Sequence, residues 1–287
     1  MIVIIILVSI CLLYLWMIHP QNLKDEKWEG FRHYYYAHRG LHDSQSNIPE
    51  NSMAAFLKAV ENGYGIELDV QLTKDGIPVI FHDEKTGRLL RDEKGAVVNK
   101  VLTELTLEEL ERYHLLASEE KVPLFEDVLK LVDGKVPLIV ELKVANSSTD
   151  TNGLCSKADL LLQKYHGLYY VESFHPACVN WYHKNRPEII RGQLAERPNA
   201  QAKRKMCIAM TIMQYLLTNF ITRPNFIAYN HHNRHNLSRM LCHCLFKNPA
   251  VAWTIRSKEE LEDNCKYFDY FVFEHFIPNS KSSSEEQ

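Results

Sequence analysis

The segment Ile66-Glu-Leu-Asp-Val-Gln-Leu72 alternates strictly between apolar and polar side chains. This period of two is typical of a β-strand whose two faces meet different surroundings. One face carries Leu68 and Val70, which we expect to pack outward against helices. The other face carries Glu67 and Asp69, which project together because residues two apart on a strand point the same way. The segment therefore indicates both a buried sheet and a pair of carboxylates directed into one site.

Further apolar, strand-like runs recur along the chain, with segments long enough for a helix between most of them. They lie at 33–37, 78–82, 138–144, 169–174, 189–194, 226–229, 250–255 and 267–273. Strands that alternate with helices favour a parallel sheet, and about eight such units favour a closed barrel. A chain of 287 residues with 46% hydrophobic content is long enough for one barrel of about 250 residues. We therefore predict an α/β fold, a TIM (β/α)8 barrel, over residues 33–279.

Residues 2–18 form an apolar run without a single charge. Its roughly 17 residues are near the lower limit for crossing the hydrocarbon core of a bilayer. A cleaved signal peptide would need a basic start and small residues at its end, whereas Leu15, Trp16 and Met17 are bulky. We therefore predict a transmembrane anchor at 1–19, with a buried core helix as the alternative.

The polar segment 20–32 is predicted to link the anchor to the barrel. Its basic residues follow the anchor and none precedes it, which favours a catalytic domain on the cytoplasmic side of a membrane. The cysteines beyond Cys11 are scattered, which suits a reducing compartment. The net charge of −3 provides no general attraction to nucleic acid, so a polyanionic ligand must be recognised by a local site. The tail 280–287 is predicted to be disordered.

Four polar clusters stand at the ends of apolar runs, where α/β barrels place their active sites. They are His38-Arg39, Glu67 with Asp69, His82-Asp83, and Glu141 with Lys143. Three carboxylates that converge in a barrel mouth repel one another, and a divalent cation would resolve that repulsion. Ligands that are all oxygen favour Mg²⁺ or Ca²⁺ over Zn²⁺. For any one acid alone, the alternative is an ion pair with a neighbouring Lys or Arg.

Two histidines at strand ends, His38 and His82, are candidates for a general acid and a general base near neutral pH. Each ends an apolar run and is followed directly by a second polar group. A structural role is the alternative, because the chain contains 14 histidines. Arg39 and Lys143 add fixed positive charge that suits a phosphate group.

These motifs together resemble the glycerophosphodiester phosphodiesterase family, in a membrane-anchored, bacterial-type form. The resemblance rests first on Ala37-His-Arg-Gly40, Pro49-Glu-Asn-Ser-Met-Ala-Ala-Phe56, Gly65-Ile-Glu-Leu-Asp-Val70, Thr73-Lys-Asp-Gly-Ile-Pro-Val79 and His82-Asp83. It continues through Pro123-Leu-Phe-Glu-Asp-Val128, Ile139-Val-Glu-Leu-Lys143, Glu172-Ser-Phe174 and Trp253-Thr-Ile255. Because it covers nearly the whole body after residue 33, it is far more specific than one short motif.

The resemblance implies a TIM barrel with a small insertion after the second strand, at about 84–122. It also implies roles for individual residues: metal ligation by Glu67, Asp69 and Glu141, acid and base roles for His38 and His82, phosphate contacts from Arg39 and Lys143, and an apolar pocket wall from Trp253. Glu50 lies in a conserved loop of the family, where it either contacts the metal or orders the site.

Towards its end the chain departs from the family pattern. Arg256 stands where Asn is usual, and residues 271–278 lack the usual Thr-Asp pair. These departures fall on the part of the pocket that would contact the alcohol, so substrate choice could differ from that of the family.

The stretch 231–244 is rich in possible zinc ligands: His231, His232, His235, Cys242, His243 and Cys244. Their spacing fits no standard structural zinc site, so we interpret them as ordinary loop and helix residues.

Residues 206–221 are mostly apolar and follow Lys203-Arg-Lys205. They are predicted to form a helix, either a buried helix of the barrel or an interfacial helix that dips into the bilayer beside the anchor.

The predicted activity is metal-dependent hydrolysis of a glycerophosphodiester to glycerol 3-phosphate and an alcohol. One alternative keeps this chemistry on membrane lysolipids, as a lysophospholipase of the D or C type. The other is a catalytically inactive binding module tethered to a membrane, against which stands the presence of all five expected metal and acid/base residues.

Overall fold

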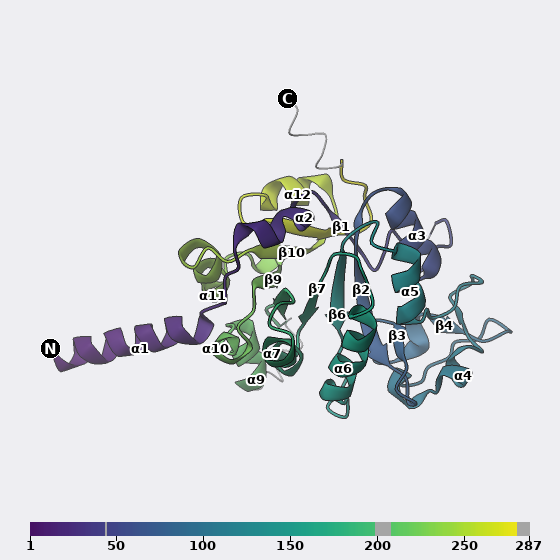
Figure 1. The fold of residues 1–287 in the computed structure, drawn as a ribbon, viewed down its shortest axis with the longest axis horizontal. Coiled ribbons are helices and arrows are strands. Elements are labelled where there is room, and N and C mark those ends of the chain that lie inside the picture. Colours follow the sequence, from purple (N-terminus) through teal and green to yellow (C-terminus); the bar gives the residue numbers. More distant parts are fainter. Residues whose placement is uncertain (44, 199–207, 280–287) are drawn as a thin grey trace.

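The computed structural model describes residues 1–43, 45–198 and 208–279, and they form the predicted barrel (Figure 1). Its parallel strands are β1 (Tyr36–His38), β2 (Gly65–Leu72), β6 (Leu138–Leu142), β7 (Tyr169–Ser173), β8 (Arg191–Ala195), β9 (Phe226–Asn230), β10 (Ala250–Ile255) and β11 (Tyr270–Phe273). Each strand pairs in parallel with the next, and β1 pairs with both β2 and β11, so the sheet closes on itself.

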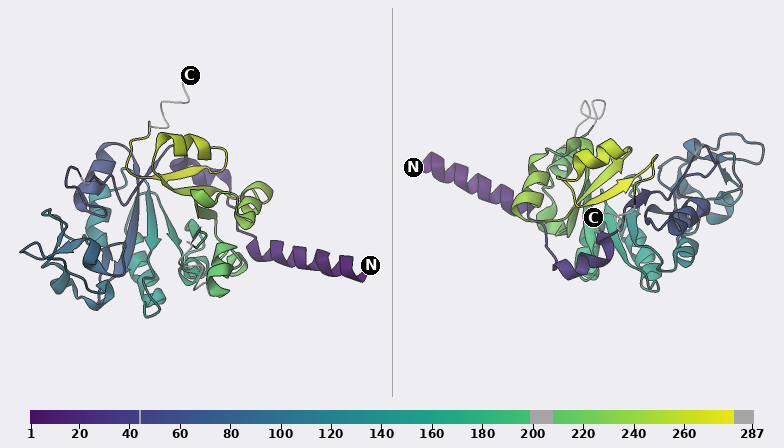
Figure 2. Two further views of the ribbon diagram at one scale, coloured as in Figure 1. Left: turned by 180° about the vertical axis from the view of Figure 1, so that it is seen from behind. Right: turned by 90° about the horizontal axis from the view of Figure 1, so that it is seen from above.

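Helices cover the outside of the sheet (Figure 2). They are α3 (Met53–Glu61), α5 (Phe125–Val132), α6 (Thr151–Leu162), α7 (Pro176–Asn185), α9 (Ile208–Gln214), α10 (Asn219–Thr222), α11 (Leu237–Met240) and α12 (Lys258–Asn264). Leu68 and Val70 of β2 are fully buried in one cluster with Phe56 of α3, Phe125 of α5 and Leu154 of α6. The outward packing predicted for this strand is therefore confirmed.

Aromatic side chains fill the end of the barrel at which the strands begin. Tyr36, Tyr170 and Phe226 stand at the first or second position of their strands and are fully buried. Trp28 and Phe31 join them from η1 (Asp25–Trp28) and α2 (Glu29–Arg32). The segment 20–32, expected as a polar linker, thus closes the amino-terminal end of the barrel with two buried aromatic rings.

An insertion lies between β2 and β6. It contains β3 (Pro78–Ile80), η2 (Thr86–Arg88), β4 (Leu90–Arg91), η3 (Leu102–Glu104), α4 (Leu107–Leu110) and β5 (His114–Leu115), and it has an apolar cluster of its own. β3 runs antiparallel to β2 because a tight turn joins them, in which the Gly76 amide donates to the Thr73 carbonyl and Gly76 has a φ of +76°. β3 is therefore an addition to the eight barrel strands.

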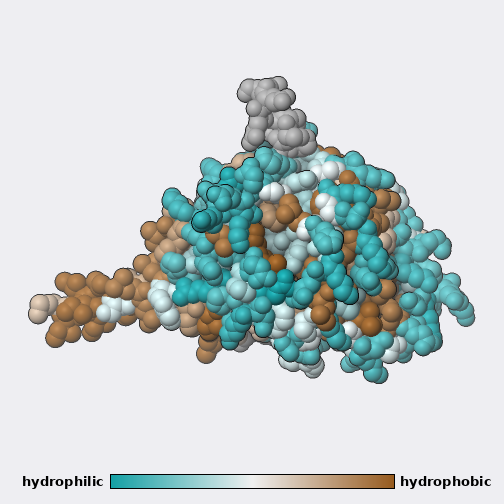
Figure 3. All heavy atoms as spheres, viewed as in Figure 1, coloured by the Kyte–Doolittle hydropathy of each residue, from teal (hydrophilic) through white to brown (hydrophobic). Residues whose placement is uncertain are grey.

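The predicted transmembrane anchor is wrong. The apolar run forms α1 (Ile2–Ile18), a helix of 17 residues that projects from the body (Figures 1 and 3). At about 1.5 Å per residue it extends about 25 Å, less than the roughly 30 Å of a hydrocarbon core. Within the described ranges, no helix combines the length and the apolar character needed to cross a membrane. The single-pass localisation predicted from this run fails with it.

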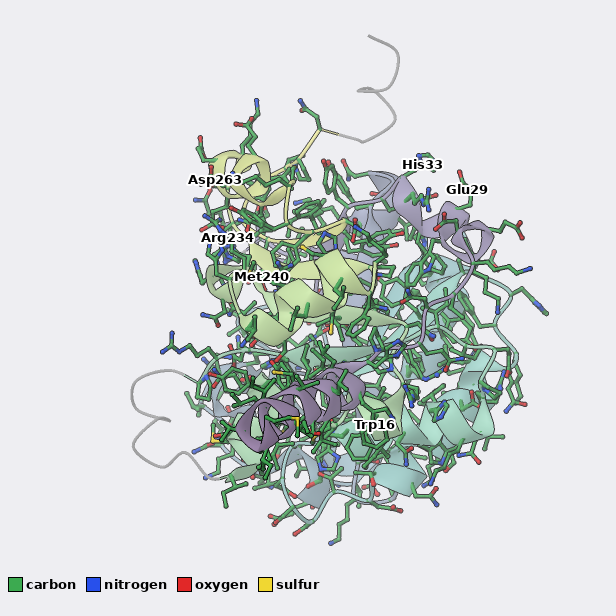
Figure 4. The ribbon with its side chains drawn as sticks, turned by 90° about the vertical axis from the view of Figure 1, so that its left-hand side faces the viewer. Trp16, Glu29, His33, Arg234, Met240 and Asp263 are labelled. Carbon is green, nitrogen blue, oxygen red and sulfur yellow. The ribbon has the colours of Figure 1, made fainter. Side chains whose placement is uncertain are left out.

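The last turn of α1 belongs to the body of the protein. Trp16 stacks on Phe220 with ring centroids 4.7 Å apart (Figure 4), and Tyr14 and Ser238 share a hydrogen bond of 2.7 Å. Ile18 is fully buried. Part of the apolar run therefore serves intramolecular packing, which the count of apolar residues could not reveal.

The continuous helix predicted for 206–221 is also wrong over the described part, which begins at residue 208. α9 and α10 are separated by a turn in which Leu216 has a φ of +56°. Leu216 is fully buried, and the Asn219 side-chain amide donates to the Ile18 carbonyl at 2.9 Å. The turn and the second helix thus hold the end of α1.

Candidate active site

Three carboxylates meet at the carboxyl-terminal mouth of the barrel, where the sequence placed them. Glu67 and Asp69 stand two residues apart on β2. Glu141 lies beside Asp69, because β6 pairs in parallel with β2 in the register Asp69–Glu141. All three are buried, and one oxygen from each lies within 4.8 Å of the others. Burial and the mutual repulsion of these charges raise the pKa values of Glu67 and Glu141 above their ordinary range.

This cluster could hold a divalent cation. All its donors are carboxylate oxygens, the ligands that hard cations such as Mg²⁺ and Ca²⁺ take. Asp69 Oδ1 is buried and accepts no hydrogen bond among the described residues, although the Lys143 ammonium lies 3.4 Å from it. A buried oxygen with an unused lone pair is the donor that a cation would use, so the residues present fit a metal.

Two basic side chains flank the carboxylates. Lys143 Nζ lies 3.0 Å from Glu141 and 3.4 Å from Asp69, and Arg39 Nε lies 3.4 Å from Asp69. Burial would raise the pKa of Asp69, but the charges of Lys143, His82 and Arg39 together hold it below its ordinary value. Asp69 is therefore the member of the cluster that stays ionised most readily.

A tight turn follows β1 at Arg39 and Gly40. Arg39 and Gly40 both have positive φ values, +57° and +79°. A Cβ on Gly40 would lie 2.8 Å from the carbonyl carbon of Ala55, so only glycine fits against α3 at this point. The tight turn directs the Arg39 amide to Glu67, to which it donates at 3.0 Å.

Glu50 orders the site through two arginines. It accepts hydrogen bonds from Arg39 at 2.6 Å and from Arg88 at 2.6 and 2.7 Å. Burial opposes ionisation, but these two partners keep the pKa of Glu50 below its ordinary value. Glu50 is not a member of the carboxylate group that could bind a cation. Its neighbour Asn51 donates to Asp69 at 2.8 Å.

Each predicted acid/base histidine has a carboxylate at Nδ1, and each carboxylate is held by an arginine. His82 Nδ1 lies 2.7 Å from Asp83 Oδ1, and Arg88 Nε donates to Asp83 Oδ2 at 2.7 Å. His38 Nδ1 lies 2.5 Å from Glu274 Oε2. Burial, partly offset by Glu274, lowers the pKa of His38 to about 4.

A pocket of about 150 Å³ opens between these groups. Its lining includes His38, Arg39, Glu67, His82, Glu141, Lys143, Glu172, Phe174, Trp253 and Arg256. Trp253 and Phe174 form an edge-to-face pair with centroids 5.5 Å apart, which gives one wall an apolar surface. Seven of the nine predicted site residues line this pocket. Asp69 lies beside Glu67 and Glu141, and Glu50 contacts Arg39.

The His- and Cys-rich stretch splits in two. His231 and His232, in η4 (His231–Asn233), come within 4.8 Å of Glu260, whereas Cys242, His243 and Cys244 lie in η5 (Leu241–Leu245). The charge of Glu260 favours a cation beside His231, whereas the charges of Arg256 and Arg234 oppose one. Burial of this imidazole lowers its pKa to about 4, as expected for a neutral core histidine.

A protein-family model matches most of the chain. Residues 38–267 match the model of the Glycerophosphoryl diester phosphodiesterase family. The chain belongs to this family. The match begins at His38 and includes every site residue named above except Glu274.

Individual relatives agree with the family match. A glycerophosphodiester phosphodiesterase of Bacillus altitudinis is 35% identical over 163 residues, which are 54% of this chain and 63% of that protein. The chain therefore spans less than two thirds of that relative's length.

Solved structures of the family share the fold. A glycerophosphoryl diester phosphodiesterase of Silicibacter pomeroyi superposes with a TM-score of 0.69 at 17% identity, over 86% of this chain and 93% of that one. A phosphodiesterase of Oleispira antarctica, solved in complex with its product sn-glycerol-3-phosphate, superposes with a TM-score of 0.66 at 21% identity, over 86% and 94% of the two chains.

Four residues of the site were not singled out by the sequence: Asn51, Arg88, Glu172 and Glu274. Asp83 was named as the neighbour of His82, without a role of its own. Asp83 and Glu274 each follow an apolar run directly, which is the signal that did identify His38 and His82. Arg88 gave no signal, because it reaches the site from the insertion, 38 residues after its partner Glu50.

Proposed function

We propose that this chain is a metal-dependent phosphodiesterase that hydrolyses glycerophosphodiesters to glycerol 3-phosphate and an alcohol. The observation that carries the proposal is the convergence of Glu67, Asp69 and Glu141 within 4.8 Å, beside a pocket that Glu67, Glu141 and two histidines line. Membership of the family and the product complex of the Oleispira enzyme support it.

The cation would be held by Glu67, Asp69 and Glu141, whose oxygen donors suit Mg²⁺ or Ca²⁺. When bound, it would offset negative charge that develops on the phosphoryl oxygens. Arg39 and Lys143 would contact the phosphate from the two sides of the cluster and add fixed positive charge. The apolar wall with Trp253 and Phe174 would pack against the carbon atoms of the substrate.

His38 and His82 would divide the proton transfers. Each has a carboxylate at Nδ1, which favours the tautomer with the proton on Nδ1 and a bare Nε2. One histidine would take the proton of the nucleophile, either water or the glycerol hydroxyl of the substrate itself. The other would protonate the leaving alkoxide. Each step of this kind contributes about 10²–10⁴-fold to the rate.

The test is release of glycerol 3-phosphate from glycerophosphocholine by the full chain in EDTA, Mg²⁺ or Ca²⁺. The variants Glu67→Gln and His82→Asn are measured beside Glu119→Gln, an exposed control in the insertion. We expect metal-dependent release that the first two variants abolish and the control retains.

Two other outcomes would replace the proposal. Release of product from dispersed lysophosphatidylcholine but not from glycerophosphocholine would make the chain a lysophospholipase. A folded protein that binds glycerol 3-phosphate but releases none from either substrate would make it a binding module.

A further inference from the structure

Glu274 occupies a position from which it contacts both the candidate acid/base histidine and an arginine. It directly follows β11 and is largely buried, with 8% of its side chain exposed. Its Oε2 lies 2.5 Å from His38 Nδ1. Its Oε1 accepts from Arg256 Nε at 2.7 Å and lies 2.7 Å from Arg256 Nη2. Glu274 is not among the three carboxylates that approach one another for a cation.

We propose that Glu274 is a positioning residue for His38, and that Arg256 holds Glu274 in place. The inference rests on the proposed function, because it assigns a partner to one of the two histidines of that reaction. A carboxylate that accepts the Nδ1–H of an imidazole fixes both the rotation of the ring and the tautomer. His38 then presents its bare Nε2 towards the pocket, where Nε2 lies 3.9 Å from Glu67.

The geometry of His38 explains why a partner is needed. β1 ends at His38, and the next residue already has a left-handed conformation. The strand therefore fixes the Cα position but not the rotation of the imidazole about its Cβ–Cγ bond, which is a soft torsion. The hydrogen bond between Nδ1 and Glu274, which follows the neighbouring strand β11, supplies this restraint.

The second histidine offers a parallel. His82, Asp83 and Arg88 repeat the order imidazole, carboxylate, guanidinium, with the contacts also at Nδ1 and at Nε. The two sets of three residues come from different parts of the chain. His82, Asp83 and Arg88 belong to the insertion, whereas His38, Glu274 and Arg256 lie at the ends of β1, β11 and β10. A recurrence of the same arrangement at both histidines indicates that it serves the imidazoles rather than local packing.

Arg256 and Glu274 form an ion pair next to His38. Both lie in the region where the chain departs from the usual family residues. Two of the three guanidinium nitrogens of Arg256, Nε and Nη2, contact the same carboxylate oxygen of Glu274. His42 and His275 approach the same carboxylate at 3.8 and 3.6 Å. Glu274 is therefore surrounded by donors, which keeps it ionised and able to accept the proton of Nδ1.

The experiment is a double-mutant cycle on the full chain with Glu274→Gln and His38→Asn. Alone, Glu274→Gln is expected to lower kcat for glycerophosphocholine by about 10²–10⁴-fold with little change in KM, since an amide can donate to Nδ1 and select the wrong tautomer. Glu274→Asp should recover part of the loss. In the His38→Asn background, Glu274→Gln should cost nothing further. The matched control is Glu188→Gln, a surface glutamate that pairs with Arg186.

A merely structural role would give a different result. The two substitutions would then be additive, and the loss would appear in thermal stability as well as in kcat; that result overturns the proposal. A Glu274→Asp variant no better than Glu274→Gln, with additive losses, leads to the same conclusion.

A second measurement does not depend on activity. Nitrogen-15 NMR of labelled histidines, with the His38 signal assigned by its loss in His38→Asn, reports which ring nitrogen carries the proton. We expect Nδ1–H in the wild type and a changed pattern in Glu274→Gln. If the wild type releases no glycerol 3-phosphate, the proposed function fails, while an unchanged tautomer in Glu274→Gln refutes the role of Glu274 separately.

Discussion

Replacement of Glu67 by glutamine is predicted to have opposite effects on stability without metal and with it. In the absence of a cation, Glu67 is buried against two other carboxylates, and burial and their charges raise its pKa. The amide removes the charge but keeps an oxygen that can accept from the Arg39 amide. The variant should therefore be more stable than the wild type in EDTA.

The size of the effect follows from the spacing of the carboxylates. Two unit charges 4.8 Å apart repel by about 3 kcal/mol at an effective dielectric constant of 20. Arg39 offsets part of this repulsion, so we expect a gain of about 2 kcal/mol in EDTA. With metal at about 100 times its dissociation constant, the free energy of unfolding of the wild type should rise by about 3 kcal/mol, which corresponds to roughly 5–10 °C in Tm. The variant should gain far less from the metal.

The pH dependence has a definite sign. A carboxyl group whose pKa is raised in the folded state contributes stability that is lost as pH rises above its unfolded value. In EDTA the wild type should therefore lose stability between pH 5 and pH 8 more steeply than Glu67→Gln.

Urea and thermal unfolding in EDTA, Mg²⁺ and Ca²⁺ test these predictions, with Glu119→Gln as the control. If Glu67→Gln is destabilised in EDTA, or gains as much from metal as the wild type does, the three carboxylates do not form a cation site.

Three further predictions concern the fold around the site. Gly40→Ala should lower the free energy of unfolding in urea by about 3 kcal/mol, because the new Cβ would lie 2.8 Å from the Ala55 backbone. Gly95→Ala, at a glycine with a similar φ but open space around it, should lower it by about 1 kcal/mol. Equal losses would refute the role of close packing. Trp28→Ala should cost about 3–5 kcal/mol in the same assay, as for a buried indole, and a loss below about 1 kcal/mol would show that the segment 20–32 does not close the barrel. Burial lowers the pKa of His231 to about 4 in the folded protein, so the unfolded chain binds a proton there first as pH falls. Between pH 7 and pH 5 the free energy of unfolding of the wild type should therefore fall by about 2 kcal/mol more than that of His231→Gln. Parallel pH curves for the two proteins would contradict this.

The barrel could be predicted from the sequence because its strands carry two kinds of information. Alternation in β2 separated Leu68 and Val70, which face the helices, from Glu67 and Asp69, which face the mouth. The ends of the apolar runs then indicated where along the barrel the polar side chains of neighbouring strands meet. Strand β3 was the exception, since its apolar character resembled that of a barrel strand while the short turn at Gly76 determined its antiparallel direction.

The error at the amino terminus has a physical cause. Hydropathy measures the preference of each side chain for an apolar environment but not which environment satisfies it. Trp16 and Ile18 find theirs against Phe220 and the buried turn at Leu216, about 200 residues away in the chain. Trp28 and Phe31 do the same inside the barrel, within a segment whose overall composition is polar. In both places the partners are distant in sequence, so a local window cannot register them.

The same limit applies to the site, and it shows most clearly at Arg256 and Glu274. The sequence marked Arg256 as a departure from the usual family residue and 271–278 as a segment without the usual Thr-Asp pair. These two observations placed the substrate pocket in doubt, but neither pointed to Glu274. In the barrel, β10 and β11 are neighbours, and the two side chains meet in one ion pair whose free oxygen reaches His38 on β1. An arginine here without the glutamate would add an unpaired charge beside the histidine, and the glutamate without the arginine would be a buried acid with only histidines as partners. We therefore interpret Arg256 and Glu274 as one pair, whose first effect is on how His38 is held.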